Sequence, residues 1–346
     1  CGGKLDIAGM ILKLRTKFAQ EDGLNPVHKF CLDTVADRHL FHSMLRIASV
    51  AQGMITKGQP MIRHLPMFLS GLTAGRSLPS VAPQPFRDIL PTIKQDVPNP
   101  KGKIAIFTGC LLDFVYVDIA TDVVKALNMA GYIVEMPLGQ ACCGAPATYM
   151  GDVENAKKAA EMNLNAMEAE KYDYIVSACP TCTHALRDYV DFFKDNPEML
   201  KKAEELRSKT FDFCKLVSML GGLPDTGDGV PMKVTYHDSC HLNRYLGVTK
   251  EQRELLKATK GVELIEMHDC DKCCGFGGSY SVKFPEMSAP ILEEKINNIV
   301  ASGADVVAVD CPGCLLQIRG GLDARGLNNI QVKHTAQIVV EKREKK

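Results

Sequence analysis

The sequence of 346 residues has no excess of charge of either sign and no long apolar run. Lysine and arginine together number 41, as do aspartate and glutamate, which argues against a general nucleic-acid partner or an acidic tail. No apolar stretch approaches the roughly 18 residues that a membrane-spanning helix needs. The chain is therefore expected to be soluble, with membrane contact only at the periphery and through partners.

Signals for nucleotide binding and secretion are also missing. No GxGxxG or Walker sequence is present, and Gly275, Gly277 and Gly278 belong to a cysteine-containing loop. No charged–apolar–small pattern of a secretory signal occurs, although processing would remove one. The chain begins with Cys1 instead of methionine, which fits either the interior of a longer protein or a lipidated cysteine left by signal cleavage.

Cysteine is abundant, and ten of the 14 cysteines form one pattern that occurs twice. In each copy a single cysteine precedes a CCG triplet, which precedes a CPxC pair. The gap before the triplet is 31 and then 32 residues, and the gap after it is 34 and then 35. Equivalent cysteines lie 130 to 132 residues apart, so the chain contains an internal duplication. The first set is Cys110, Cys142, Cys143, Cys179 and Cys182, and the second set is Cys240, Cys273, Cys274, Cys311 and Cys314.

Five thiols in each copy make iron–sulfur chemistry the first hypothesis. A structural zinc site needs four thiolates and would leave one thiol over in each copy. Disulfide frameworks are typical of short secreted chains, whereas CxxC and adjacent cysteine pairs suit metal ligation. Buried cysteines that pack as small hydrophobic residues are the remaining alternative, which fits single cysteines better than ten in duplicate register. We therefore expect a reducing, cytoplasmic location.

The first hundred residues differ in character from the rest. Apolar spacing predicts an amphipathic helix over 4–20 and further helix over 27–56. Seven prolines between 66 and 100 predict an extended linker with little regular structure. Residues 1–100 are thus expected to form a helical segment and a proline-rich linker.

Strands alternate with helices in both repeats, which predicts an α/β fold with a small parallel sheet in each, flanked by helices. The expected repeats cover 101–225 and 226–346. The expected strands cover 103–107, 132–135, 174–177, 233–236, 262–266, 306–309 and 330–333, and the expected helices cover about 116–130, 152–170, 285–301 and 334–341.

The single cysteine and the CPxC pair of each repeat directly follow predicted strands. Right-handed crossovers place the carboxyl ends of parallel strands on one edge, where such folds bind ligands. Proline in each CPxC suits the first turn of a helix, whose free N–H groups stabilise thiolates. Glycine in each CCG permits a positive φ and close approach of the backbone to an inorganic core.

These motifs resemble the CCG, or cysteine-rich, domain. It occurs in heterodisulfide reductase subunits B and D and in the iron–sulfur subunits of lactate-utilisation, glycolate-oxidase and anaerobic glycerol-3-phosphate dehydrogenase systems. The local sequence is most similar to the lactate and glycolate branch in three segments. The resemblance covers about 103–340. The segments are YHDSCHL at 236–242, CCGFGGSYSVKFPEMS at 273–288 and DCPGCLLQIRGGL at 310–322.

The resemblance implies that each set of five cysteines holds one non-cubane [4Fe–4S] cluster. It further implies an electron-transfer subunit that works with a flavoprotein dehydrogenase and other iron–sulfur or membrane subunits, on the inner face of the membrane. In the dehydrogenase branch the first motif is often incomplete, whereas both are complete here. Completeness favours the heterodisulfide reductase type, which reduces disulfides on the cluster, so catalyst and relay stay open. A zinc-stabilised structural protein is the third hypothesis.

The resemblance also gives Cys1 a role. In relatives a two-cluster ferredoxin module precedes the CCG repeats, and its last cysteine is followed by a segment like KLDIAGMILKLR. Cys1 would be that last ligand, and a further ferredoxin-type [4Fe–4S] cluster would lie outside this chain.

Several residues outside the ten-cysteine pattern have two interpretations. His237, Asp238 and His241 surround Cys240 as candidate general acids, or they hydrogen-bond cluster sulfurs and neighbouring loops. Cys270 forms an extra CxxC with Cys273 and is either an alternative ligand or a loop thiol. Two further cysteines are expected to be structural, namely Cys31 on a predicted helix and Cys214 in an apolar run.

Overall fold

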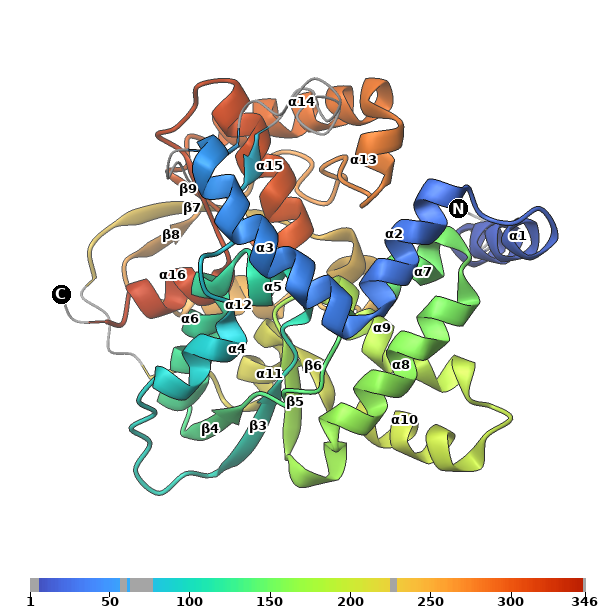
Figure 1. Cartoon of the computed structure of the whole chain (residues 1–346). Coiled ribbons are helices and arrows are strands. Elements are labelled where there is room, and N and C mark those ends of the chain that lie inside the picture. The colour runs from blue at the N-terminus through green and yellow to red at the C-terminus, as the bar shows by residue number, and fades with distance from the viewer. Residues whose placement is uncertain (1–5, 57–60, 63–76, 225–228, 345–346) are drawn as a thin grey trace.

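A computed structural model describes residues 6–56, 61–62, 77–224 and 229–344, and Cys1 lies outside this part (Figure 1). The chain opens with three helices, α1 (Ile7–Glu21), α2 (Pro26–Ala36) and α3 (Arg38–Thr56). Asn25 caps α2 by accepting a hydrogen bond from the Val27 N–H, with proline at the first position. The predicted helix over 27–56 is broken at Asp37, whose ψ of 100° is extended.

The described part of the proline-rich segment contains more regular structure than its composition predicts. Strands β1 (Met61–Ile62) and β2 (Leu78–Pro79) pair antiparallel, and helix α4 (Phe86–Ile89) continues into a 3₁₀ turn, η2 (Leu90–Thr92). Phe86 is fully buried, and burial of this side chain stabilises the short helix against the first repeat. The expectation of an extended linker is therefore wrong at residues 86–92.

The first repeat contains a parallel sheet in the order β4-β3-β5-β6. Its strands are β3 (Gly102–Ile106), β4 (Tyr132–Glu135), β5 (Tyr174–Ser177) and β6 (Thr210–Asp212). Its helical segments are α5 (Gly109–Phe114), α6 (Val117–Met129), α7 (Ala145–Met150), α8 (Val153–Met167), η3 (Ala169–Lys171), α9 (Pro180–Asp188), η4 (Tyr189–Phe192), α10 (Pro197–Lys209) and α11 (Phe213–Met219).

The second repeat has the equivalent order β8-β7-β9-β10, also parallel. Every residue of the inner strand β9 is buried, as expected for a parallel strand covered on both faces. Its strands are β7 (Met232–His237), β8 (Val262–Leu264), β9 (Val306–Val309) and β10 (Gln331–Lys333). Its helical segments are the π-helical η5 (His241–Tyr245), α12 (Glu251–Lys257), α13 (Tyr280–Lys283), α14 (Pro285–Ser302), α15 (Pro312–Ala324) and α16 (Thr335–Glu341).

The predicted fold class is confirmed, since two parallel sheets flanked by helices follow a helical and proline-rich segment. Strand β6, which the sequence analysis did not predict, completes the first sheet. Cys214 is fully buried, as expected. Cys31 is exposed on α2, so the expectation that it packs as a structural residue is wrong.

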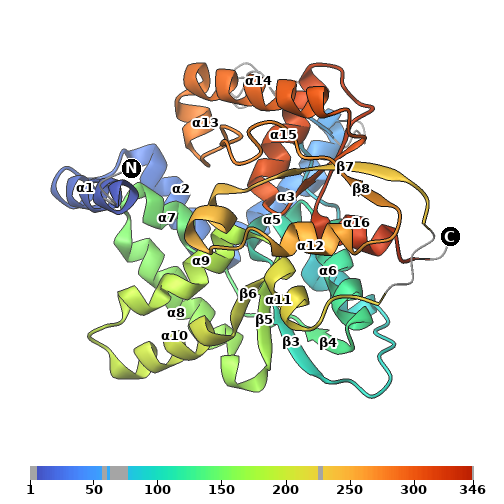
Figure 2. The ribbon, with the colours of Figure 1, turned by 180° about the vertical axis from the view of Figure 1, so that it is seen from behind.

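The two repeats pack through reciprocal contacts. Helix α16 of the second repeat packs against α6 of the first, and α11 of the first packs against α12 of the second (Figure 2). One buried apolar cluster contains residues of both repeats, including Leu127 of α6 and Val339 of α16. Such reciprocity is the pattern of an isologous dimer, so the repeats are related by a pseudo-two-fold axis.

The amino-terminal segment bridges the two repeats on one side. Helix α2 packs against α8 of the first repeat. At the other end, β2 lies against α15 of the second repeat, and the Ser77 N–H donates to the Gly320 carbonyl over 3.3 Å. In Figure 1, α3 runs as the blue helix between these two regions.

Candidate metal centre

The ten cysteines of the two sets lie just beyond the carboxyl ends of sheet strands. Cys110 follows β3, and Cys240 follows β7. Cys179 and Cys311 directly precede α9 and α15, whose first residue is in each case the proline of CPxC. The CCG loops follow β4 and β8. The architecture therefore gathers both sets at the sheet edge that the sequence analysis predicts as the binding edge.

The thiols of both sets form one continuous row in which neighbours lie within hydrogen-bonding reach of each other. Cys179 and Cys311 interact with each other across the pseudo-two-fold axis, so the two sets meet there. The order along the row is Cys110, Cys142, Cys143, Cys182, Cys179, Cys311, Cys314, Cys274, Cys273 and Cys240.

The glycines of both CCG triplets adopt left-handed backbone conformations. Gly144 has a φ of 80° and Gly275 has a φ of 83°. A Cβ on Gly275 would lie 2.7 Å from the Ser288 carbonyl oxygen of α14, closer than atoms pack. The Gly275 N–H points back at the Cys273 sulfur, 3.3 Å away. These turns let adjacent cysteines face the same region, as the sequence analysis expects.

Neighbouring thiols of the row shift one another's pKa in opposite directions. Hydrogen bonds from the Cys142 and Cys182 thiols lower the pKa of Cys143 to about 5. The Cys179 and Cys314 thiols hold the pKa of Cys311 well below its usual range. By contrast, interaction with Cys273 raises the pKa of Cys274. A metal core between the thiols would deprotonate all of them, because its positive charge stabilises every thiolate at once.

His237 belongs to the second set in space. Its ring nitrogen and the sulfurs of Cys274 and Cys314 all lie within 4.8 Å of one another. The side chain is fully buried, and neither ring nitrogen has a hydrogen-bond partner among the described residues. Burial lowers its pKa to about 4, so the ring is neutral at pH 7. A buried unpaired polar group costs about 1–3 kcal/mol, so the ring is placed for a partner at this site.

Asp238 and Cys270 both contact Arg253. Arg253 donates to both carboxylate oxygens of Asp238, over 2.8 and 3.0 Å, and to the Cys270 sulfur over 3.6 Å. Arg253 also forms an ion pair with Glu266. Asp238 and Cys270 are thus held in a polar network beside the second set, and their proposed roles as general acid and alternative ligand stay predictions.

His241 lies where the two repeats meet. Its Nε2 is 2.8 Å from the Tyr149 hydroxyl of the first repeat, and its ring stacks on Tyr245. Burial lowers its pKa. His184 contacts both Tyr149 and Tyr245, and its Nε2 lies 3.1 Å from the Asp188 carboxylate. The sequence analysis missed Tyr149 and His184, although each lies within six residues of a paired cysteine.

Lys295 is a second group that sequence reasoning missed. Its ammonium is almost completely buried and donates to the Asp269 and Cys270 carbonyls over 2.5 and 3.3 Å. These bonds tie the second CCG loop to α14. A signal was available, because Lys295 shares one buried stripe of α14 with Leu292 and Ile299.

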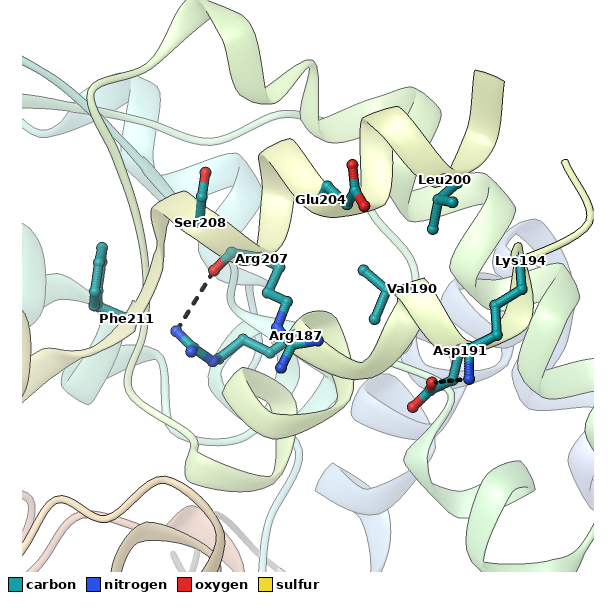
Figure 3. Close-up of a pocket in the computed structure, with 9 residues that line it drawn as sticks. All are labelled: Arg187, Val190, Asp191, Lys194, Leu200, Glu204, Arg207, Ser208 and Phe211. Atoms are coloured by element: carbon teal, nitrogen blue, oxygen red, sulfur yellow. Dashed lines mark hydrogen bonds and ion pairs between the residues drawn. The ribbon is translucent and has the colours of Figure 1, made fainter. Parts of the chain in front are cut away.

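A surface pocket of about 750 Å³ lies elsewhere on the first repeat, between α9 and α10 (Figure 3). Arg187, which lines it, donates to the Arg207 carbonyl over 3.5 Å. None of the ten paired cysteines is among the residues that line it. The pocket is therefore separate from the thiol row.

Comparison with known proteins agrees with the geometry of the row. The CCG cysteine-rich domain matches residues 104–187 and again 234–319. Lactate utilization protein A of Shouchella clausii is 39% identical over 240 residues, which are 69% of this chain and 99% of that protein. The chain belongs to the lactate utilization protein A family. The Bacillus subtilis protein of this family is 36% identical over 238 residues, 68% of this chain and 98% of that protein.

Among solved structures, a hypothetical protein from Helicobacter pylori has a similar fold. Its TM-score is 0.51 at 13% identity, over 75% of this chain and 54% of that one. This likeness concerns the fold alone. Within the described residues of this lactate utilization protein A family member, every helix is too short or too polar to cross a bilayer.

Proposed function

We propose that this chain is an iron–sulfur electron-transfer subunit of an oxidoreductase that uses lactate or a related 2-hydroxyacid. The observation that carries the proposal is the continuous row of ten thiols, divided by the pseudo-two-fold axis into two complete sets. Membership of the lactate utilization protein A family supports the substrate class.

Each set would hold one [4Fe–4S] cluster of the non-cubane type, which accepts and releases single electrons when bound. The first would use Cys110, Cys142, Cys143, Cys179 and Cys182, and the second would use Cys240, Cys273, Cys274, Cys311 and Cys314.

The protein supplies three things to such clusters. Seven of the ten cysteines are buried and the other three are partly buried, which limits access of water and oxygen. Free N–H groups at the start of α9 and α15 stabilise negative charge on the thiolates that they face. Contact between Cys179 and Cys311 gives electrons a short path between the two sets.

We further propose that a flavoprotein dehydrogenase donates electrons to this subunit in the cytoplasm, at the inner face of the membrane. The acceptor would be another iron–sulfur or membrane subunit. Co-purification from cells with a flavoprotein, together with lactate-dependent reduction of the chain, is the expected result. If lactate reduced the chain in none of the co-purified complexes, the proposed substrate class would be contradicted.

The test of the cofactor is iron and acid-labile sulfide analysis on anaerobically purified protein. About eight irons per chain are expected, and replacement of Cys274 by serine should remove about half. Cys270→Ser is the matched control and should leave the iron content unchanged, since its sulfur faces Arg253. Zinc without sulfide would instead support a structural zinc protein.

Direct disulfide reduction is the second candidate function, because both sets of five thiols are complete. Under this alternative, disulfide-dependent oxidation of a reduced viologen should occur and should disappear in Cys273→Ser. If the chain turned over no disulfide but was reduced in a lactate-dependent way, the result would favour the electron-transfer function over disulfide reduction.

A further inference from the structure

The two repeats differ at one buried position beside their thiols. Phe107 and His237 each lie three residues before the first cysteine of their set, and both side chains are fully buried. In the first repeat, a Cβ built on Gly109 would lie 3.6 Å from the Phe107 ring and 2.9 Å from the Cys182 sulfur. Phe107 thus lies near Cys182, as His237 lies near the equivalent Cys314.

The exchange of phenylalanine for histidine changes what the thiols face. Phenylalanine offers no hydrogen-bond donor, whereas neutral imidazole carries one N–H. Both nitrogens of His237 lack partners among the described residues, and the sulfurs of Cys274 and Cys314 lie within 4.8 Å of one of them. The N–H is therefore available to a sulfur atom at the second set, and the first set has no counterpart.

A second exchange acts in the same direction. Asn163 and Lys295 each lie 16 residues before the first cysteine of their CPxC pair, and both anchor the CCG loop. Asn163 donates to the Cys142 carbonyl over 2.9 Å, while Lys295 donates to the Asp269 and Cys270 carbonyls. The loop contact is kept, but the second repeat gains a buried ammonium whose charge acts on Cys274.

Nearby carboxylates do not cancel this difference. Arg253 neutralises Asp238 by a two-bond ion pair. Asp310 is buried beside Cys311 and accepts a hydrogen bond from the Tyr236 hydroxyl over 2.6 Å. Its other carboxylate oxygen lies 3.6 Å from the Cys214 sulfur of the first repeat, so Asp310 lies between the two repeats and does not belong to the second set alone.

We propose that His237 and Lys295 make the two clusters unequal, with a higher reduction potential at the second repeat. Hydrogen bonds to sulfur and positive charge both stabilise the reduced, more negative state of a cluster. Electrons that enter the first repeat are therefore held at the second. This inference rests on the proposed function, since it requires two bound clusters.

The experiment is a potentiometric titration followed by EPR, on protein whose iron and sulfide content is measured in the same sample. The wild-type chain should show two one-electron waves. His237→Phe, which installs the residue of the first repeat, should lower only the upper wave. Phe107→His should raise only the lower wave, and Lys295→Asn should lower the upper wave without moving the lower one.

His237→Asn tests the same role if the phenylalanine variant loses its second cluster. Asparagine keeps an N–H donor, so this variant should retain more of the upper potential than His237→Phe. Weak nitrogen coupling to the second cluster, lost in His237→Phe, is also expected. Full iron content with unmoved waves would overturn the inference and leave the proposed function standing. Strong nitrogen coupling, which marks a direct iron–nitrogen bond, would overturn the hydrogen-bond role. Wild-type protein without iron and sulfide would overturn both proposals.

Discussion

At the residue scale, Gly275 of the second CCG triplet is under a tight steric constraint. Gly275 combines a φ of 83° with close approach to the backbone of α14. Gly303, at the carboxyl end of the same helix, also has a positive φ of 67° but has open space where a side chain would project. Comparison of substitutions at Gly275 and Gly303 therefore distinguishes the cost of backbone strain from the cost of a packing clash.

Gly275→Ala should destabilise the protein by about 3 kcal/mol or more, because left-handed strain of about 1–2 kcal/mol adds to displacement of α14. Gly303→Ala, the control, should cost only the strain. Chemical denaturation measures both free energies, and iron analysis should show loss from the second set in Gly275→Ala alone. Equal destabilisation by the two variants would contradict a close-packed turn.

Site residues could be predicted from the sequence where their spacing alone identifies them. The ten cysteines and the two CCG glycines fall into this class, because the duplication fixes their positions. The partner of Asp238 could not be predicted, since Arg253 lies 15 residues away on α12 and only the packing of that helix brings the two together. Lys295 was missed although it lies in the buried stripe of α14, because the sequence does not show the loop carbonyls that its ammonium binds.

At the element scale, one buried ion pair fastens the amino-terminal segment to the first set of thiols. Arg87 of α4 donates through Nε to the fully buried Asp113 of α5 over 2.7 Å. The backbone N–H of Arg87 donates to the other carboxylate oxygen of Asp113 over 3.1 Å. Cys110 lies on the same short helix, α5. The pair therefore positions a proposed cluster ligand from outside its own repeat.

Arg87→Met should destabilise the chain by about 3–5 kcal/mol, because it leaves the buried Asp113 carboxyl uncompensated. Arg87→Met combined with Asp113→Leu should recover much of this loss, since it removes the buried charge as well. Denaturation midpoints of the single and double variants measure the difference. A double variant no more stable than the single one would show that the pair acts through packing and not through charge.

Elements with strong apolar periodicity could be predicted, and short ones could not. Strand β5 lies at 174–177 in both the prediction and the structure, because its apolar run lies between polar loops. Strand β6 has only three residues and pairs with β5 along one edge, so tertiary pairing defines it. Helix α4 exists because Phe86 is buried, a fact that a proline-rich composition conceals.

At the scale of the whole molecule, the repeats share a buried core and should unfold together. Leu127 of α6 is fully buried in the cluster that includes residues of α16. Gln337 of α16 donates to Asp118 of α6 over 2.8 Å, and Lys125 pairs with Glu344 over 2.7 Å. Neither repeat would retain this core alone.

Scanning calorimetry of the intact chain should show one endotherm, in which Leu127→Ala moves the whole transition to lower temperature. The substitution should cost about 2–5 kcal/mol, as large-to-small changes in a packed core do. Two resolved transitions, only one of which responds to Leu127→Ala, would contradict a shared core.

The contact between Cys179 and Cys311 has a consequence for how the halves could specialise. Equivalent residues meet each other only on a two-fold axis, so two identical chains could build the same row of ten thiols. Such a homodimer would have to place the same side chain at 107 and at 237, because one coding sequence would specify both. Covalent linkage of the halves removes that restriction. One side of the axis has phenylalanine and asparagine where the other has histidine and lysine, so a symmetric frame can give electron flow a direction.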